Sequence, residues 1–404
     1  MGGNAFATIL RPGSFPRMPP AVYTALKAQL LPKIQSLYEC AAVPREAPEK
    51  TSHGDLDFIV STPRINVVDG GEPLVRVNVA HDIVQKAIGA QYVNPLEGNR
   101  TSNFAVPVAR GEWKALGHGK EEDAAVEAVP DGKIFYQVDI NVCASKTEFE
   151  RVVFFHGYGD LGMIMSMLAK NVGLNLGEKG LRLPNQPHPP IELTESMEEI
   201  AQFMGWSMDA WNAGFKTKLE AFEWALTTPF FNPRTFRLQG EGIRKVAEDR
   251  TMYAEFTRWV STKASIINPV YHDEDPKLSE EQKRVAFRER VLVHFNKKEM
   301  FDALNLERNQ RVKIKEIFNG SRVRDWAELG GYWKGVKLIM DAVREKFGGE
   351  AGVLKLYNLE GEEGVKRAVL DAKKQLSLVS KETFQQKPEA ISSVDELVTG
   401  IGKL

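Results

Sequence analysis

Two aspartates stand at the head of an apolar run in the stretch "TSHGDLDFIV", residues 51–60. In a strand, alternate side chains project from one face, so Asp55 and Asp57 would lie about 6 to 7 Å apart while Leu56 enters the core. Carboxylates at the edge of a buried strand cost free energy unless a cation meets them. A strand that simply begins at solvent would explain the pair, and so would a divalent metal site with oxygen ligands.

A third aspartate, Asp139, lies inside the apolar stretch "FYQVDINV". An ion pair with arginine or lysine, or a cap at a strand end, would satisfy a carboxylate there. A neighbouring strand that carries Asp55 and Asp57 would satisfy it through shared divalent ions instead. Paired ions of this kind activate a hydroxyl and stabilise a leaving phosphate. The three acids are therefore the candidate catalytic and metal-binding site.

The segments "HGDLDFIV" and "FYQVDINV" resemble the catalytic signature of the DNA polymerase β-like nucleotidyltransferase superfamily. Three longer segments resemble blocks of a nucleotidyltransferase group found in large DNA viruses, phages and fungi: "FHGYGDLGMIMSMLAKNVGLNLGEKGLRL", "FMGWSMDAWNAGFKTKLEAFEWALTTPFFNPRTF" and "IFNGSRVRDWAELGGYWKGVKLIMD". The resemblance therefore covers most of the chain.

This resemblance implies a metal-dependent enzyme that moves a nucleoside monophosphate from a triphosphate such as ATP to an acceptor hydroxyl, releasing pyrophosphate. The implied cofactor is magnesium or manganese. Asp55 and Asp57 would hold both ions and the triphosphate, while Asp139 would serve the second ion and activate the hydroxyl. By analogy, the expected acceptor is an RNA 3′ end, for example that of tRNA.

One departure from the family concerns phosphate binding. Its members usually carry Gly-Gly or Gly-Ser at a helix start about ten residues before the aspartate pair, where backbone N–H groups hold phosphates. Here the corresponding stretch is "AAVPREAPEKTSH", which contains neither. Lys50, Thr51 and Ser52 are candidate replacements, because ammonium and hydroxyl groups also bind phosphate oxygens, and Gly54 beside the aspartate pair is a further candidate nucleotide-binding residue. A solvated loop explains the same residues equally well.

The stretch "FHGYGDLG" is a second candidate binding segment. Its glycines allow a tight turn, Asp160 is placed to cap the helix that follows, and Tyr158 is placed to stack on a nucleobase. The resemblance implies that this loop lines the nucleotide pocket, with His156 beside the tyrosine. Capping alone would explain the aspartate.

Other polar residues are weaker candidates. Lys179, near the turn "GEKGLRL", is a candidate phosphate ligand, with solvated charge as the alternative. Arg100 and Asn103 are placed ahead of an expected strand. They are candidates for base or ribose recognition, and an exposed polar loop is the alternative interpretation. Two basic successions are candidate tracks for a nucleic-acid acceptor, with ordinary surface ion pairs as the alternative. They are Arg244, Lys245, Arg250 and Arg258, and then Arg308, Arg311, Lys313, Lys315, Arg322 and Arg324.

The elements that would carry these residues follow from hydrophobic periodicity. Residues 21–43 predict a helix bent at Pro32, with an apolar face of Val22, Leu26, Leu30, Ile34 and Leu37. Strands are expected at residues 54–62, 92–95, 103–109 and 133–145, and helices at 80–90 and after the glycine turn at 156–160. Residues 117–132 are expected to form a loop. From about residue 190 the pattern is almost wholly helical.

Together with the resemblance, this order predicts an α/β (α+β) nucleotidyltransferase-fold catalytic domain with a mixed sheet at residues 1–190. A mostly α-helical C-terminal domain that binds substrate or acceptor is expected at residues 191–404. With 404 residues, of which 43% are apolar, the chain has enough material for more than one core.

Composition excludes several classes of protein. The 53 basic and 54 acidic residues leave a net charge of −1, so phosphate or nucleic-acid binding requires local clusters. Cys40 and Cys143 are too few for a disulfide framework or a zinc cluster. The sequence has no secretion signal and no apolar run that would span a bilayer, which predicts an intracellular protein, cytoplasmic or nuclear, without a membrane partner.

Two alternatives to RNA nucleotidyl transfer stay open. A catalytically idle nucleotide- or RNA-binding protein would explain the missing Gly-Ser, although three retained acids would then repel one another without a purpose. A second-messenger synthase or a protein-nucleotidylating enzyme would use the same chemistry at phosphorus. The product distinguishes these enzymes from one another.

Overall fold

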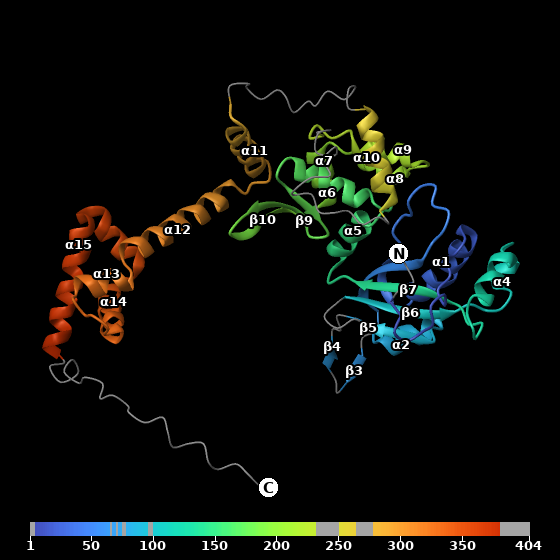
Figure 1. Cartoon of the computed structure of the whole chain (residues 1–404), viewed down its shortest axis with the longest axis horizontal. Helices are drawn as coiled ribbons and strands as arrows, with labels where there is room; N and C mark the ends of the chain where they lie inside the picture. Colours follow the sequence, from blue (N-terminus) through green and yellow to red (C-terminus); the bar gives the residue numbers. More distant parts are fainter. Residues whose placement is uncertain are drawn as a thin grey trace, which may run out of the picture. The chain divides into compact units, whose positions relative to one another are not determined.

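The computed structural model describes residues 5–64, 67–69, 72–74, 78–95, 100–231, 250–263 and 278–379. The chain forms two compact units, Met1–Asn296 and Lys297–Leu404. A mixed α/β region comes first and a mostly helical part follows, which confirms the predicted fold class (Figure 1). Among the described helices, none combines the length and the apolar character that crossing a bilayer requires.

A five-stranded mixed sheet is the centre of the first unit. Its strands are β1 (Tyr38–Ala42), β2 (Asp55–Pro63), β5 (Tyr92–Pro95), β6 (Thr101–Pro107) and β7 (Phe135–Val142), in the order β1-β2-β7-β6-β5. The central pair, β2 and β7, is parallel, and the other neighbours are antiparallel. A separate antiparallel pair is formed by β3 (Val67–Asp69) and β4 (Glu72–Leu74).

Three helices pack into the core on one face of this sheet: α1 (Pro20–Gln35), α2 (His81–Ile88) and α3 (Glu112–Ala115). Alternate residues of the strands point into one core with them, which is why Leu56, Phe58 and Val138 are fully buried. The predicted apolar face of the first helix is buried as expected. The predicted helix over residues 21–43 is too long, however, because the β-sheet takes Tyr38–Ala42 as an edge strand.

The segment 117–132 is not the expected loop, because α4 (Gly119–Glu127) forms there. Its sequence, GKEEDAAVE, is rich in the strong helix formers alanine, glutamate and lysine. Glu122 anchors the helix, since its buried carboxylate accepts hydrogen bonds from the backbone N–H groups of Gly111 and Lys114. Helix propensity and this anchor outweigh the flanking glycines.

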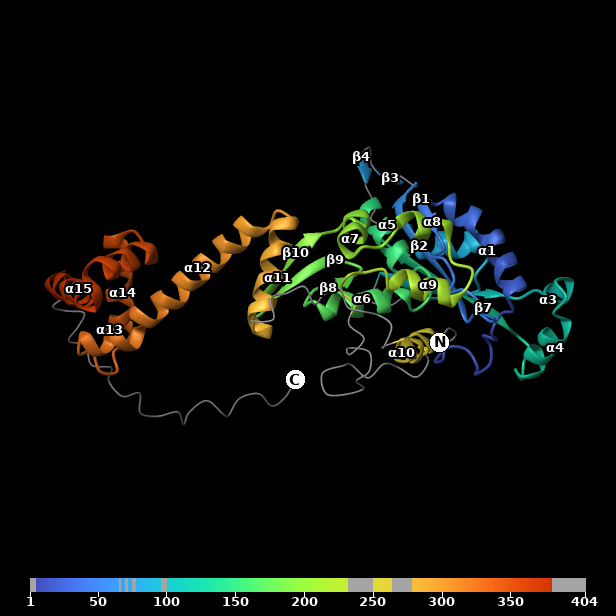
Figure 2. The same ribbon diagram turned by 90° about the horizontal axis from the view of Figure 1, so that it is seen from above.

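After the sheet, the chain forms α5 (Lys146–Phe155), a glycine turn and α6 (Leu161–Asn171). A three-stranded antiparallel sheet follows, with β8 (Asn175–Gly177), β9 (Gly180–Asn185) and β10 (His188–Thr194) in the order β10-β9-β8. Helix α6 lies against β8, as Figure 2 shows. This small sheet was not among the predicted elements.

Helices complete the first unit: α7 (Met197–Met204), α8 (Met208–Ala213), α9 (Lys218–Ala225), α10 (Thr251–Lys263) and α11 (Glu280–His294). Trp206, Trp211, Phe222 and Trp224 are each at most 5% exposed. These aromatic residues therefore form core and not a stacking platform for bases.

The second unit consists of α12 (Lys298–Ile317), α13 (Gly320–Trp326), α14 (Trp333–Phe347) and α15 (Glu350–Val379). Its own core contains Val323, Ile339, Val353 and Val369. The second basic succession, from Arg308 to Arg324, lies on α12 and α13. In the first succession, Arg244 and Lys245 lie outside the described residues.

Candidate functional site

The three aspartates converge at the centre of the sheet. Asp57 and Asp139 are register partners on the parallel strands β2 and β7, and Asp55 precedes Asp57 by two residues on the same face. One carboxylate oxygen from each residue lies within 4.8 Å of the other two. The expected meeting of these acids is confirmed, and it results from the parallel pairing of two strands that are distant in sequence.

The acids lie on the face of the sheet opposite the helical core. At one end this face is covered by the N-terminal segment, where Phe6 and Phe15 pack with Phe135. At the other end it is covered by α5, where Val152 packs against Ile59. The carboxylates lie between these two apolar patches, so Asp55 and Asp139 are half-buried and Asp57 is exposed.

Electrostatic repulsion shapes the cluster. Asp57 lines a concave site, and desolvation there, together with the charges of Asp55 and Asp139, raises its pKa to about 7. Burial also raises the pKa of Asp139 to about 6, although hydrogen bonds lower it in part. Within the described part of the chain, no lysine or arginine forms an ion pair with any of the three acids.

A divalent cation would relieve this repulsion. Three carboxylates with oxygens this close offer the hard ligands that magnesium and manganese prefer. Raised pKa values at Asp57 and Asp139 are what an unneutralised acidic metal site displays. The residues present therefore fit a divalent-cation site.

Two buried amides hold Asp139 in place. Asn103 on β6 donates from Nδ2 to Asp139 Oδ1 at 2.7 Å, and Gln137 donates from Nε2 to both oxygens at 3.1 and 3.0 Å. Asn103 is thus a buried residue of β6 that supports the acid, and it does not lie in an exposed loop. The sequence contained a signal for Gln137 alone, since it precedes Asp139 by two residues on the same strand face.

A pocket of about 780 Å³ opens at the acids. Asp55 and Asp57 line it, together with Lys50, Ser52 and Gly54, which were all predicted as nucleotide-binding residues. Asp139 is not among the lining residues, but its carboxylate lies beside the other two. The loop before β2 contributes to the pocket wall, and so do residues of α6, α9 and the start of α10.

The loop wall is fixed by Glu46. Its carboxylate accepts hydrogen bonds from the Tyr23 hydroxyl at 2.5 Å and from the Lys50 ammonium, and it lies 3.2 Å from His53 Nδ1. Burial opposes ionisation of this group, but the contacts with His53 and Lys50 lower the pKa of Glu46 to about 2. The loop is therefore tied to α1, and the charge of Lys50 is already neutralised.

Tyr158 does not line the pocket. Its ring is 3% exposed and packs edge-on against Trp211, with centroids 4.8 Å apart. Its hydroxyl donates to the Trp211 carbonyl at 2.9 Å and accepts from Arg45 Nη1 at 2.7 Å. The residue therefore holds Arg45 in position at the pocket wall.

Lys179 is exposed on the β8–β9 turn, outside the pocket lining. The adjacent Glu178 does line the pocket, and it pairs with His156 at 2.7 Å.

Asp160 occupies the N-cap position of α6, but its side chain does not cap that helix. It accepts instead from Arg250 Nη1 at 3.1 Å and from the backbone N–H of Tyr253 at 3.2 Å. The expected capping role is therefore wrong. The carboxylate joins α6 to the start of α10, two elements that the pocket wall includes.

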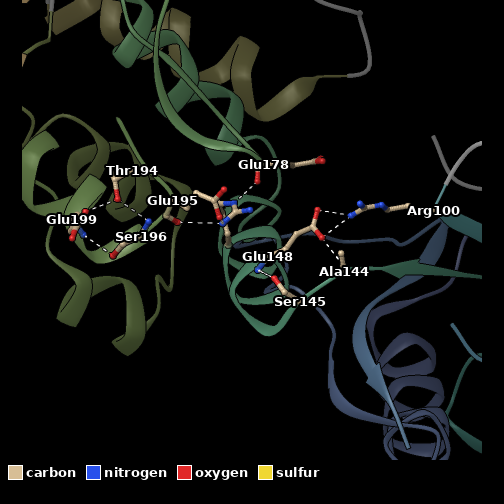
Figure 3. A network of polar contacts seen from close by, with 10 residues as sticks. Arg100, Ala144, Ser145, Glu148, Glu178, Thr194, Glu195, Ser196 and Glu199 are labelled. Carbon is tan, nitrogen blue, oxygen red and sulfur yellow. Dashed lines mark hydrogen bonds and ion pairs between the residues drawn. The ribbon is translucent and has the colours of Figure 1, made fainter. Parts of the chain in front are cut away.

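A polar network fixes α5, which precedes the glycine turn (Figure 3). At its N-terminus the Ser145 hydroxyl caps the helix, and Glu148 accepts two hydrogen bonds of 2.6 Å from Arg100. Arg151, which is buried, donates to the Glu178 carbonyl and pairs with Glu195 at 2.8 Å. Arg100 thus anchors a helix and does not line the pocket.

No family model and no curated protein matches this sequence. What is shown is a mixed five-stranded sheet that carries an acidic triad able to hold a divalent ion.

Proposed function

We propose that the protein is a metal-dependent nucleotidyltransferase, and that it transfers a nucleoside monophosphate from a nucleoside triphosphate to an acceptor hydroxyl. The observation that carries this proposal is the convergence of Asp55, Asp57 and Asp139 on two parallel strands at one pocket. The pattern of two acids on one strand and a third on its neighbour is the one that the sequence shares with polymerase β-like enzymes. The parallel register supports that resemblance.

In the proposed step, the acceptor oxygen forms a bond to the α-phosphorus, and the bond from that phosphorus to the bridging β-phosphate oxygen breaks. Pyrophosphate leaves with the bonding electron pair. Asp139, whose carboxylate lies beside those of Asp55 and Asp57, takes up the hydroxyl proton as the general base. Asn103 and Gln137 keep that carboxylate in one orientation while it does so.

Asp55 and Asp57 supply the ligands for divalent ions at the pocket, with Asp139 beside them. When bound, magnesium or manganese neutralises developing charge on the phosphates and lowers the pKa of the acceptor hydroxyl. The pocket volume of about 780 Å³ lies within the range of small-molecule sites and is large enough for a nucleotide.

We propose an RNA 3′ end as the acceptor, with the helical part of the chain, residues 191–404, contributing to acceptor binding. Support comes from the basic residues of α12 and α13, of which Arg311, Lys313 and Lys315 are exposed. Because the net charge of the chain is −1, such a local cluster is where a polyanion would bind.

The test is incubation of the full-length protein with magnesium and each labelled nucleoside triphosphate, with and without total RNA. We expect label in RNA from the wild-type chain, and at least about a thousandfold less from Asp57→Asn or Asp139→Asn. Asp123→Asn, which changes an exposed aspartate on α4, is the matched control and should leave transfer unchanged.

The other products identify the alternatives. Label in protein or in a small dinucleotide product would show that the protein is a nucleotidyltransferase whose acceptor is not RNA. Transfer that persists in Asp139→Asn would contradict the assigned proton acceptor. No transfer under any condition, with triphosphate still bound by the wild-type chain, would favour the idle binding protein.

A further inference from the structure

Phosphate oxygens require cations that the protein has not already neutralised. Lysine or arginine side chains of five residues line the pocket: Arg17, Arg45, Lys50, Lys218 and Arg250. Three of them form ion pairs, Lys50 with Glu46, Lys218 with Glu255 at 2.8 Å, and Arg250 with Asp160 at 3.1 Å. Within the described part of the chain, Arg17 and Arg45 have no carboxylate partner.

The two arginines differ in how their hydrogen-bond donors are used. Arg45 donates to the Tyr158 hydroxyl and to the carbonyls of Trp211 and Asn212, so it fastens the pocket wall to α8. Among the residues that the structure describes, Arg17 donates only to Ser52, from Nε to Oγ at 2.8 Å and from Nη2 to the carbonyl at 3.0 Å. A guanidinium has five N–H donors, so Nη1 of Arg17 stays available to an anion.

The position of Arg17 is fixed by the backbone. Its neighbour Met18 pairs with His53 through two hydrogen bonds, N–H to carbonyl in each direction, at 2.7 and 2.9 Å. His53 is 3% exposed, and its ring stacks on Tyr23 with centroids 3.9 Å apart. This pairing sets the arginine beside Ser52, and β2 begins with Asp55 three residues further on.

We propose that Arg17, clamped by Ser52, binds phosphate oxygens of the nucleoside triphosphate, in the place of the absent Gly-Ser backbone amides. The inference rests on the proposed function and names a subsite of the same pocket. Three observations carry it: an exposed guanidinium without a carboxylate partner, the two-point clamp, and the shared pocket with Asp55 and Asp57. The planar fork suits the contact, because guanidinium binds phosphate in a bidentate manner.

The probe is tripolyphosphate with magnesium, which has no base and therefore does not depend on nucleotide identity. Titration calorimetry on the full-length chain compares the wild type with Arg17→Gln and with Arg11→Gln, a matched charge loss on an exposed residue of the same segment that does not line the pocket. We expect Arg17→Gln to bind tripolyphosphate about tenfold to a hundredfold more weakly, and Arg11→Gln to bind like the wild type.

Two further measurements keep the result independent of folding and of catalysis. Ser52→Ala retains the positive charge and removes one point of the clamp, so it should weaken tripolyphosphate binding about threefold to tenfold even if Arg17→Gln does not fold. Manganese binding, followed by electron paramagnetic resonance, should be the same in Arg17→Gln as in the wild type, because the acids are intact.

Wild-type affinity for tripolyphosphate in Arg17→Gln, or no tripolyphosphate binding by the wild-type chain, would overturn the role of Arg17. Neither result affects the proposed function if label is still transferred in an aspartate-dependent manner. The converse result is also possible. If Arg17→Gln loses tripolyphosphate binding but the wild type transfers no label, Arg17 still belongs to a phosphate subsite, and the proposed nucleotidyltransferase activity is wrong.

Discussion

Repulsion among the three carboxylates raises the free energy of the folded chain, and hydrogen bonds offset only part of this cost. The amides of Asn103 and Gln137 stabilise the charge of Asp139, whereas Asp57 has no such donors among the described residues. Its pKa is accordingly the higher of the two, about 7 against about 6. A bound cation would remove this repulsion and so stabilise the folded chain, as expected for a metal centre.

Replacing Asp57 should therefore stabilise the metal-free protein. The folded-state pKa of about 7 lies above the ordinary value, so the wild type loses stability as pH rises from about 4 to about 7. Because the carboxylate is exposed, we expect a screened effect, with Asp57→Asn raising the free energy of unfolding by about 1 kcal/mol above pH 7 and not at all near pH 4.

Urea unfolding in the presence of EDTA at several pH values measures this difference, with Asp123→Asn as the control. Manganese should reverse the order, since it binds the folded wild type and stabilises it by mass action. A stability difference between Asp57→Asn and the wild type that does not change with pH would contradict the charge-repulsion account.

The acids themselves were predictable, because carboxylates within apolar strands need a cationic partner, and a divalent ion shared by all three supplies one. Their supporting residues were not. Asn103 meets Asp139 only through the antiparallel register of β6 and β7, and Arg17 meets Ser52 only through the Met18–His53 pairing. Contacts that depend on strand register across tens of residues leave no local pattern in the sequence.

At the level of elements, the pocket depends on close contact between the glycine turn before α6 and the loop before β2. Gly159 has a φ of +67°, and a Cβ atom there would lie 2.8 Å from the Cβ atom of Ala47. The Tyr158 N–H also donates to the Arg45 carbonyl at 2.6 Å. The two segments are thus held together by backbone contact, and no side chain fits between them.

Gly159→Ala tests this contact, and Gly173→Ala is its matched control. Both positions have a positive φ, but a Cβ atom at Gly173 would meet nothing within 4 Å. We expect Gly173→Ala to lower the free energy of unfolding by about 1 kcal/mol through backbone strain alone, and Gly159→Ala by about 3 kcal/mol because the clash adds to it. Equal losses in urea unfolding would show that the turn and the loop are not tightly packed.

Apolar spacing and short apolar runs located most elements of the first region. The first helix and α2 were predicted from apolar residues three and four apart, and the strands β2, β5, β6 and β7 from short runs bounded by turn residues. The edge strand β1 was absorbed into the predicted helix, since the burial pattern of YECAA lacks strict alternation. The short strands β8 to β10 and the polar helix α4 carry too little apolar periodicity to be distinguished from loops.

At the scale of the whole molecule, charge is balanced overall and uneven locally. Every residue that lines the 780 Å³ pocket belongs to the first unit, Met1–Asn296. In the second unit, the sequence from Arg308 to Lys337 contains eight basic and three acidic residues. On α14, Trp333 is 53% exposed, and the Arg324 guanidinium lies 5.2 Å from its ring centroid. An exposed aromatic ring beside unbalanced positive charge suits single-stranded nucleic acid.

The proposed RNA acceptor should therefore depend on the exposed lysines next to this ring. We expect the double change Lys334→Glu and Lys337→Glu to weaken binding of a labelled single-stranded RNA about tenfold and to flatten its salt dependence, since fewer phosphate contacts release fewer counter-ions. Lys355→Glu with Lys374→Glu changes the net charge equally at exposed positions of α15 and is the control. Filter binding over a range of salt concentrations measures both. If the two double variants lose affinity equally, the effect is one of total charge, and α14 is not the acceptor surface.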